Sequence, residues 1–192
     1  SLFSQALECQ FKALKLKEQS NNKPFIANSL SNIGMIFSRL YNLDKALEYS
    51  QKALELRKSV DDKRGIASSY NEIGRIYDKM NQYDKAVKYF EEAINMRREM
   101  KSLSGQALSL ENLGMVYFKL EKFEESRKIL FEAKNIAEEM KENKTVSGIY
   151  RNIANLNLSQ NRYDEALFYI KRSYEIAKSH DLLCVPTMAT ES

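Results

Sequence analysis

Side chains that can hydrogen-bond a peptide backbone return at intervals of 40 residues in this sequence. The clearest set is Asn32, Glu72, Asn112 and Asn152. An asparagine amide both donates and accepts hydrogen bonds, so a row of amides can hold an extended peptide whatever its side chains are. The same amides could instead bond neighbouring parts of the fold, and the sequence leaves both roles open.

Groups that could catalyse a reaction are not arranged for catalysis. The only histidine, His180, precedes Asp181, and we expect it at the end of a helix, where a positive charge favours the helix dipole. Paired acids are expected on solvent-facing helix surfaces: Glu91-Glu92 and Glu124-Glu125. Each glycine is isolated, so no phosphate-binding loop is expected. We therefore expect no catalytic residue, no cofactor, no metal site and no enzyme activity.

Charge and hydropathy argue against several classes of partner. The 30 Lys and Arg residues against 26 Asp and Glu leave a net charge of +4, which is spread along the chain, so we expect no nucleic-acid partner. No apolar run of about 18 residues and no signal peptide occurs, so no membrane association is expected. Cys9 and Cys184 are far apart, and Cys9 is predicted to be a small buried hydrophobic residue. Without a disulfide framework, a cytoplasmic location is favoured.

The elements that must position these side chains are repeats of 40 residues. Residues 71–77 read Asn-Glu-Ile-Gly-Arg-Ile-Tyr, and similar segments occupy residues 31–37, 111–117 and 151–157. Self-similarity at such a period indicates a stack of repeats. Small residues keep the same spacing: Gly34, Gly74, Gly114 and Ala154; Ala46, Ala86, Ser126 and Ala166; Ala53, Ala93, Ala133 and Ser173. Such residues let two antiparallel helices approach to about 8–10 Å where they cross.

Each repeat is predicted to be a pair of antiparallel helices, an A helix followed by a B helix. The expected solenoid covers residues 1–183, as a half repeat at 1–23 and full repeats at 24–63, 64–103, 104–143 and 144–183. Residues 184–192 are expected to be a truncated next A helix or a disordered tail, unless residues 183–186 occupy the groove of a neighbouring molecule. The first helix has no A helix before it, and the tail could form only part of a next one. The chain is therefore expected to be truncated at both ends.

Residues at the helix ends refine this prediction. Three residues are suited to N-cap positions: Asn22, Asp62 and Ser102. Asn81 and Asn161 stand where a left-handed backbone is expected, which asparagine tolerates. Tyr41 and Glu121 occupy the same place in other repeats, so their turns are predicted to be irregular.

The repeat resembles the tetratricopeptide repeat family. The second repeat carries almost the complete family pattern: Tyr70, Ile73-Gly74, Tyr77, Ala86, Tyr89-Phe90 and Ala93. The usual repeat is about 34 residues long, so the 40-residue variety predicts longer helices. The resemblance implies an all-α fold, a right-handed α-α superhelix of antiparallel helix pairs whose A helices line a concave groove.

The resemblance also places the groove-facing side chains, at six, three and two residues before the small residue of helix A and one, four and five after it. The candidate peptide-binding residues are Asn28, Asn32, Met35, Asn71, Glu72, Arg75, Lys79, Glu111, Asn112, Met115, Phe118, Lys119, Arg151, Asn152 and Asn155. Met35, Met115 and Phe118 would give adaptable apolar contacts. The Arg and Lys residues could bind an acidic group.

The expected function is a non-catalytic scaffold that binds a protein or peptide ligand in the concave groove. An alternative is the sensory or regulatory input region of a bacterial signalling protein: a kinase, a cyclase, a transcription regulator or a peptide-controlled phosphatase. Self-association through exposed repeat ends is a further prediction.

Overall fold

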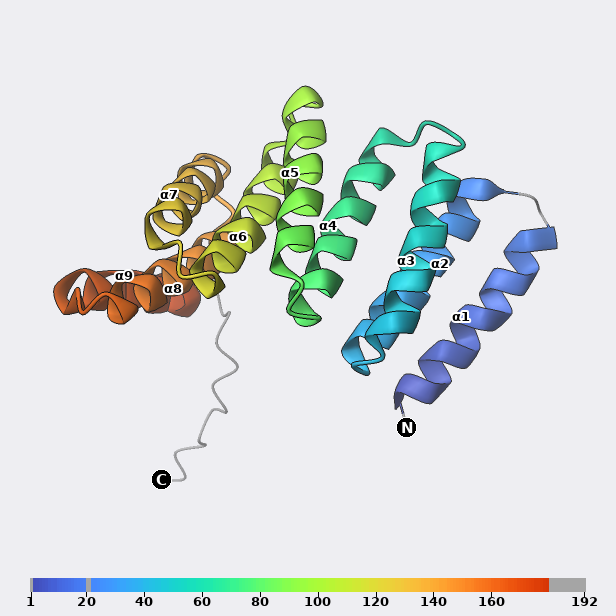
Figure 1. The fold of residues 1–192 in the computed structure, drawn as a ribbon, viewed down its shortest axis with the longest axis horizontal. Helices are drawn as coiled ribbons and strands as arrows, with labels where there is room; N and C mark the ends of the chain where they lie inside the picture. Colours follow the sequence, from blue (N-terminus) through green and yellow to red (C-terminus); the bar gives the residue numbers. More distant parts are fainter. Residues whose placement is uncertain (1, 20–21, 180–192) are drawn as a thin grey trace, which may run out of the picture.

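The computed structural model describes residues 2–19 and 22–179, and these residues form nine α-helices and no strand. The helices are α1 (Leu2–Gln19), α2 (Lys23–Arg39), α3 (Leu43–Lys58), α4 (Lys63–Lys79), α5 (Tyr83–Glu99), α6 (Leu103–Lys119), α7 (Phe123–Glu139), α8 (Asn143–Ser159) and α9 (Tyr163–Ser179). They follow one another along a curved stack, from α1 at the right of Figure 1 to α9 at the left. The expected all-α, right-handed superhelix of antiparallel pairs is confirmed. None of the described helices is long and apolar enough to cross a membrane.

The even-numbered helices line the inner side of this curve. Each of them contacts the next even-numbered helix, whereas no two odd-numbered helices of the described chain contact each other. In a curved stack of helix pairs, the helices on the inner side are the ones that come close together. We therefore call α2, α4, α6 and α8 the A helices, and α3, α5, α7 and α9 the B helices.

Small residues stand where the two helices of a pair cross, as predicted. A Cβ atom on Gly74 would lie 2.8 Å from Cε1 of Phe90, and one on Gly114 would lie 2.7 Å from Cγ of Leu130. On helix B, Ser126 is fully buried and donates a hydrogen bond from Oγ to the carbonyl oxygen of Gly114, at 2.8 Å. Bulky side chains of the B helices thus occupy the space that the glycines leave.

A residue with a left-handed backbone ends each helix from α2 to α8. These residues are Tyr41, Asp61, Asn81, Lys101, Glu121, Lys141 and Asn161, with φ between 51° and 60°. The next N–H bonds a carbonyl five residues earlier, as from Asn42 to Phe37 and from Lys122 to Tyr117, both at 2.9 Å. This is the Schellman hydrogen bond. The prediction of irregular turns at Tyr41 and Glu121 is therefore wrong, because backbone bonds fix the turn whatever its side chain is.

We predict that Glu121→Gly stabilises the protein. A residue with a β-carbon costs about 1–2 kcal/mol in the left-handed region, and glycine removes this cost. Glycine also makes the unfolded chain more flexible, which offsets part of the stabilisation. The free energy of unfolding should therefore rise by roughly 0.5–1 kcal/mol, measured by urea denaturation followed by circular dichroism. Asn81→Gly is the control and should change stability little. Equal stability of the Glu121 variant and the parent protein would contradict this account of the turn.

The predicted N-caps are only partly formed by side chains. Asn22 accepts a hydrogen bond from the N–H of Phe25 at 3.4 Å, and Asp62 accepts one from the N–H of Gly65 at 2.9 Å. Ser102 stands at the N-cap position of α6, but its side chain makes no capping bond. These bonds satisfy N–H groups that have no partner within the helix.

Two buried arginines hold successive repeats together, and neither was predicted from the sequence. Arg97 in α5 donates from Nη1 to the carbonyl oxygen of Gly105 and to Oγ of Ser109, both in α6. The equivalent bonds between α3 and α4 join Arg57 to Gly65 and Ser69. Glycine is needed here, since a Cβ on Gly105 would lie 2.9 Å from Nε of Arg97. The available signal was an arginine followed by glycine after 8 residues and by serine after 12.

Cys9 is exposed, so the prediction that it is buried is wrong. Its equivalents Tyr49 and Tyr89 stack on Phe37 and Tyr77 of their own A helices, with ring centroids 5.6 Å and 5.4 Å apart. The described residues include no A helix on that side of α1, so Cys9 has no such ring to cover it. Three other predictions concern residues outside the described part: His180, Cys184 and the tail 184–192.

Candidate functional site

The candidate residues all lie on the A helices. We define the inner face as the side chains six, three and two residues before, and one, four and five residues after, Gly34, Gly74, Gly114 and Ala154. Hydrogen bonds between successive A helices join residues 71 and 112, 111 and 152, 38 and 79, and 78 and 119. Four of the six positions therefore lie where the A helices meet, on the inner side of the curve.

Amide side chains of the inner face bond from one A helix to the next. Nδ2 of Asn112 donates to Oδ1 of Asn71 at 3.2 Å, and Nδ2 of Asn152 donates to Oε1 of Glu111 at 2.8 Å. Asn71 is buried, and its Oδ1 also accepts from Oγ of Ser109 at 2.8 Å. These three amides thus join repeats, which was the structural alternative that the sequence left open.

Charged side chains of the inner face are also joined in pairs. Lys79 donates to the carbonyl oxygen and Oγ of Ser38, at 3.0 Å and 2.9 Å. Lys119 contacts the carboxylate of Asp78 at 2.6 Å. Ser38 and Asp78 stand at predicted groove-facing positions, four residues after Gly34 and Gly74, and they pair with candidates 41 residues later. A 40-residue period predicts that equivalent positions of successive A helices are neighbours. The pairs are 41 residues apart instead of 40, and this shift of one residue depends on the tilt between the helices.

Other candidates on the inner face remain available to a ligand. Asn32 is half-buried and Asn155 is exposed, and the side chain of neither makes a hydrogen bond with the described part of the chain. Met35 is exposed, whereas Met115 is half-buried. Arg151 is exposed beside the half-buried Glu111.

Three candidates are less available than the sequence suggested. Phe118 is half-buried, with its ring centroid 6.0 Å from that of Phe123. Asn28 is exposed, but its Oδ1 accepts a hydrogen bond from Nη2 of Arg57 at 2.9 Å. Glu72 pairs with Arg75 on its own helix, at 3.2 Å.

Burial raises the pKa of Glu111, although the charge of Arg151 and the hydrogen bond from Asn152 both lower it. A folded-state pKa above the unfolded value means that the protonated carboxyl favours folding. This contribution is complete below the ordinary pKa near 4.5 and is lost as the pH rises through the folded-state pKa. At neutral pH the buried carboxylate therefore destabilises the fold.

We predict that Glu111→Gln raises the melting temperature at pH 7. Glutamine keeps the oxygen that accepts from Asn152 and removes the buried charge. The gain should disappear at pH values below about 4.5, where the native carboxyl is also protonated. Circular dichroism melts at both pH values measure it, with Glu92→Gln on the exposed surface of α5 as the control. A less stable Glu111 variant at pH 7 would show that attraction to Arg151 outweighs burial.

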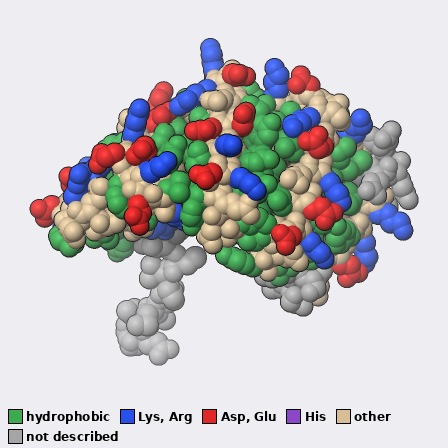
Figure 2. Space-filling model, viewed as in Figure 1, with side chains coloured by type: hydrophobic (Ala, Val, Ile, Leu, Met, Phe, Trp, Pro, Cys, Tyr) green, Lys and Arg blue, Asp and Glu red, His purple; other side chains and the backbone are tan. Residues whose placement is uncertain are grey.

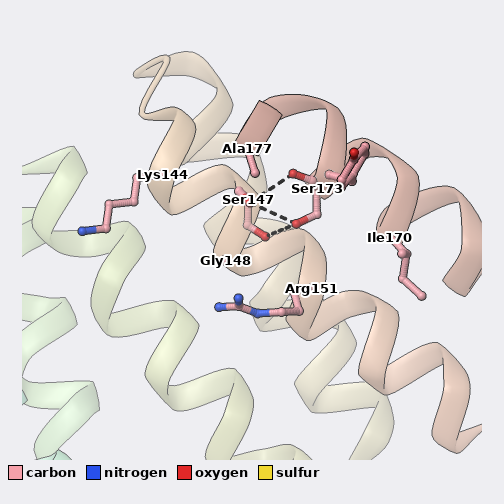
Figure 3. A pocket seen from close by; sticks show the side chains of 8 residues that line it. Lys144, Ser147, Gly148, Arg151, Ile170, Ser173 and Ala177 are labelled. Carbon is pink, nitrogen blue, oxygen red and sulfur yellow. Dashed lines mark hydrogen bonds between the residues drawn. The ribbon is translucent and has the colours of Figure 1, made fainter. Parts of the chain in front are cut away.

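A pocket of about 460 Å³ lies at the end of the stack, between α8 and α9 (Figure 3). It is lined by Lys144, Ser147, Gly148, Arg151, Ile170, Ser173, Tyr174 and Ala177. Ser147 and Ser173 bond each other across it, with Oγ atoms 3.0 Å apart. Ile170 and Tyr174 are exposed, although their equivalents in the second repeat, Phe90 and Ile94, are buried. The end of the stack therefore exposes apolar side chains whose equivalents in the second repeat are covered.

The described residues show no assembled metal site and no surface of one charge in the view of Figure 2. No group of three or more His, Cys, Asp or Glu side chains is placed to hold a metal ion in the described part. On the face drawn in Figure 2, basic and acidic side chains alternate between hydrophobic ones. Side chains of the inner face can donate and accept hydrogen bonds and make apolar contacts, and these are the contacts by which peptides are bound.

The sequence model of the tetratricopeptide repeat matches residues 25–99 and 105–179, which is more than half of the chain. The chain belongs to the tetratricopeptide repeat family. That model describes a repeat and indicates no catalytic family. The comparison with curated proteins found no match.

Solved tetratricopeptide structures share this fold. BtubC (BKLC) from P. vanneervenii is 18% identical with a TM-score of 0.82, over 93% of this chain and 75% of that one. Aspartyl phosphate phosphatase F from Bacillus subtilis is 15% identical with a TM-score of 0.78, over 82% of this chain and 42% of that one. A Rap protein complexed with Competence and Sporulation Factor is 15% identical with a TM-score of 0.64, over 92% of this chain and 59% of that one. The chain thus spans less than two thirds of the phosphatase and of the Rap protein.

Proposed function

We propose that this chain is a non-catalytic scaffold that binds an extended protein or peptide segment along its inner face. The observation that carries the proposal is the combination of fixed A helices with uncovered side chains between them. Hydrogen bonds such as that from Asn112 to Asn71 hold successive A helices in place. The side chains of Met35 and Asn155 on the same face are exposed and form no hydrogen bond to a neighbouring helix. A surface fixed before binding loses little entropy when a ligand arrives.

The chemistry of the uncovered side chains suits a polypeptide ligand. Asn32 and Asn155 can each donate to a carbonyl oxygen and accept from an N–H of an extended backbone. Met35 and Leu108 offer apolar contact surface, and methionine adapts to many shapes. The Rap protein of similar fold was solved with Competence and Sporulation Factor bound, which gives a precedent for ligand binding in this architecture.

The test is a double substitution, Asn32→Ala with Asn155→Ala. Peptides are first enriched on the parent protein from a random library, and their affinities for both proteins are then compared. Loss of these amides should weaken binding by roughly tenfold, which corresponds to about 1.4 kcal/mol. The melting temperature should stay nearly unchanged, since neither side chain bonds a neighbouring repeat. Gln51→Ala with Asn95→Ala, on exposed B-helix positions, is the matched control and should bind normally. Equal affinities for all three proteins would overturn the proposal.

A second candidate function is the regulatory input region of a bacterial signalling protein. Aspartyl phosphate phosphatase F and Rap proteins are among the structures of similar fold, and this chain spans only part of each. In this case the same inner face would bind the controlling peptide, in a reducing cytoplasmic setting. Sequencing the gene around residues 1–192 tests this candidate: a kinase, cyclase or DNA-binding domain there would favour it.

Self-association through the repeat ends stays a prediction. The exposed Ile170 and Tyr174 at the end of the stack favour it, because their equivalents in the second repeat, Phe90 and Ile94, are buried. Light scattering over a range of protein concentrations measures it. A mass that stays that of one chain at high concentration would remove the idea.

A further inference from the structure

The charged side chains of the inner face are sorted by exposure. Every exposed charged residue among the inner-face positions is basic, and each A helix carries one: Arg39, Arg75, Lys119 and Arg151. The three acidic residues of the same face are all half-buried: Glu72, Asp78 and Glu111. The surface that a ligand meets is therefore positive, although basic and acidic residues are interleaved along the helices.

The ion pairs explain how this sorting arises. Arg75 contacts Glu72, and the side chain of the arginine is 50% exposed whereas that of the acid is 13% exposed. Lys119 contacts Asp78, with exposures of 38% and 23%. In each pair the acid is the less exposed partner, so the base is the group that a ligand can reach. A guanidinium has five N–H donors, so Arg75 keeps donors for a second carboxylate.

We propose that the inner face selects an acidic extended polypeptide segment, whose carboxylates bind over Arg75, Lys119 and Arg151. This proposal rests on the proposed function and names the chemistry of its ligand. A carboxylate that meets a positioned arginine forms charge-assisted hydrogen bonds, which are stronger than neutral ones. The exposed Leu108 and Leu158 lie on the same face and give apolar contact between the charges.

The spacing of the helices sets the spacing of acids in the ligand. Contacting helices lie about 8–10 Å apart, and an extended chain advances about 3.3 Å per residue. Carboxylates that reach cations on α4, α6 and α8 should therefore be separated by about three or more residues. Single-stranded nucleic acid fits less well, because it needs stacking aromatic side chains. None of the exposed aromatic residues of the described chain is at an inner-face position.

The test compares peptides selected from a random library about 12 residues long, enough to cross four A helices when extended. Selection is run on the parent protein, on Arg75→Gln with Arg151→Gln, and on Lys88→Gln with Lys128→Gln. The last pair removes the same charge from exposed positions of B helices. Peptides from the parent and the B-helix control should carry a net negative charge. The inner-face variant should bind these peptides roughly tenfold more weakly than the parent does. Added salt should weaken binding to the parent more than binding to this variant, because the parent keeps the two charges.

The outcomes separate this proposal from the proposed function. Neutral or basic peptides that still depend on Asn32 and Asn155 would overturn the acidic ligand and leave the binding groove intact. Peptides that do not depend on those amides would overturn the groove itself, and the acidic ligand with it. A thymidine oligonucleotide that displaces the selected peptides at equal concentration would show that the cations serve nucleic acid instead.

Discussion

Gly74→Leu is expected to lower the free energy of unfolding by about 3 kcal/mol. A Cβ atom at this place would already lie 2.8 Å from Cε1 and 2.9 Å from Cδ1 of Phe90, which is almost completely buried in α5. The ring has no free space to move into, so α4 and α5 must separate or Phe90 must leave its rotamer. Urea denaturation followed by circular dichroism gives the loss.

Two further variants test the same contact. Gly148→Ala is the control, because the nearest atom to its Cβ is Oε1 of Glu111, at 3.2 Å and at the end of a flexible side chain. It should cost nothing, since alanine favours a helix over glycine by about 1 kcal/mol. Gly74→Ala with Phe90→Ile reproduces the pair Ala154 and Ile170 of the fourth repeat and should be more stable than Gly74→Leu. A Gly74→Leu protein as stable as the parent would show that the helices do not cross at this residue.

Arg97→Ala should cost about 2–3 kcal/mol, the second large effect on stability. Arg97 is buried and donates to Gly105 and Ser109, and its removal leaves both acceptors without their donor. A buried polar group that loses its partner costs more than the hydrogen bond contributed. The lost stability should appear as weaker docking of α6 on α5, seen as faster amide hydrogen exchange in α6.

The contact between α7 and α8, one repeat further along the chain, shows which substitutions should compensate for Arg97→Ala. Between α7 and α8 the equivalent positions are Ala137, Thr145 and Ile149, and both Ala137 and Ile149 are fully buried. The triple variant Arg97→Ala, Gly105→Thr, Ser109→Ile copies this apolar junction. It should recover most of the stability, since replacing both sides of a buried polar contact by packed apolar groups is close to neutral. Equal loss in the single and triple variants would mean that Arg97 acts through other contacts.

The sequence predicted the helices well because the periodic residues are the ones that must touch. Gly114 and Ser126 meet inside one repeat, and both belong to sets of small residues at 40-residue spacing, so this spacing reports the packing of a pair directly. The turn at Glu121 was predicted wrongly because side-chain preference was weighed, whereas the backbone bond from Lys122 to Tyr117 decides. Residue types and spacing therefore predict the packing of a helix pair better than they predict the turns at the helix ends.

The inner face was predictable in position but not in pairing. Its residues lie on the A helices as expected, yet the sequence could not show that Asn112 reaches Asn71 while Asn32 reaches no described residue. Pairing depends on the tilt between repeats, which brings residues 41 apart together. The exposure of Arg75 above Glu72 likewise arises only when both side chains are packed in three dimensions.

Methionine methyl groups report directly whether a ligand binds along the inner face. Met35 and Met115 lie on the inner face, whereas the exposed Met140 ends α7 away from it. Methyl signals of a methionine-labelled protein are recorded by NMR while a library-selected peptide is added. If the ligand binds there, the signals of Met35 and Met115 should shift and saturate together while that of Met140 stays in place. Shifts at Met140 with no change at Met35 and Met115 would contradict it.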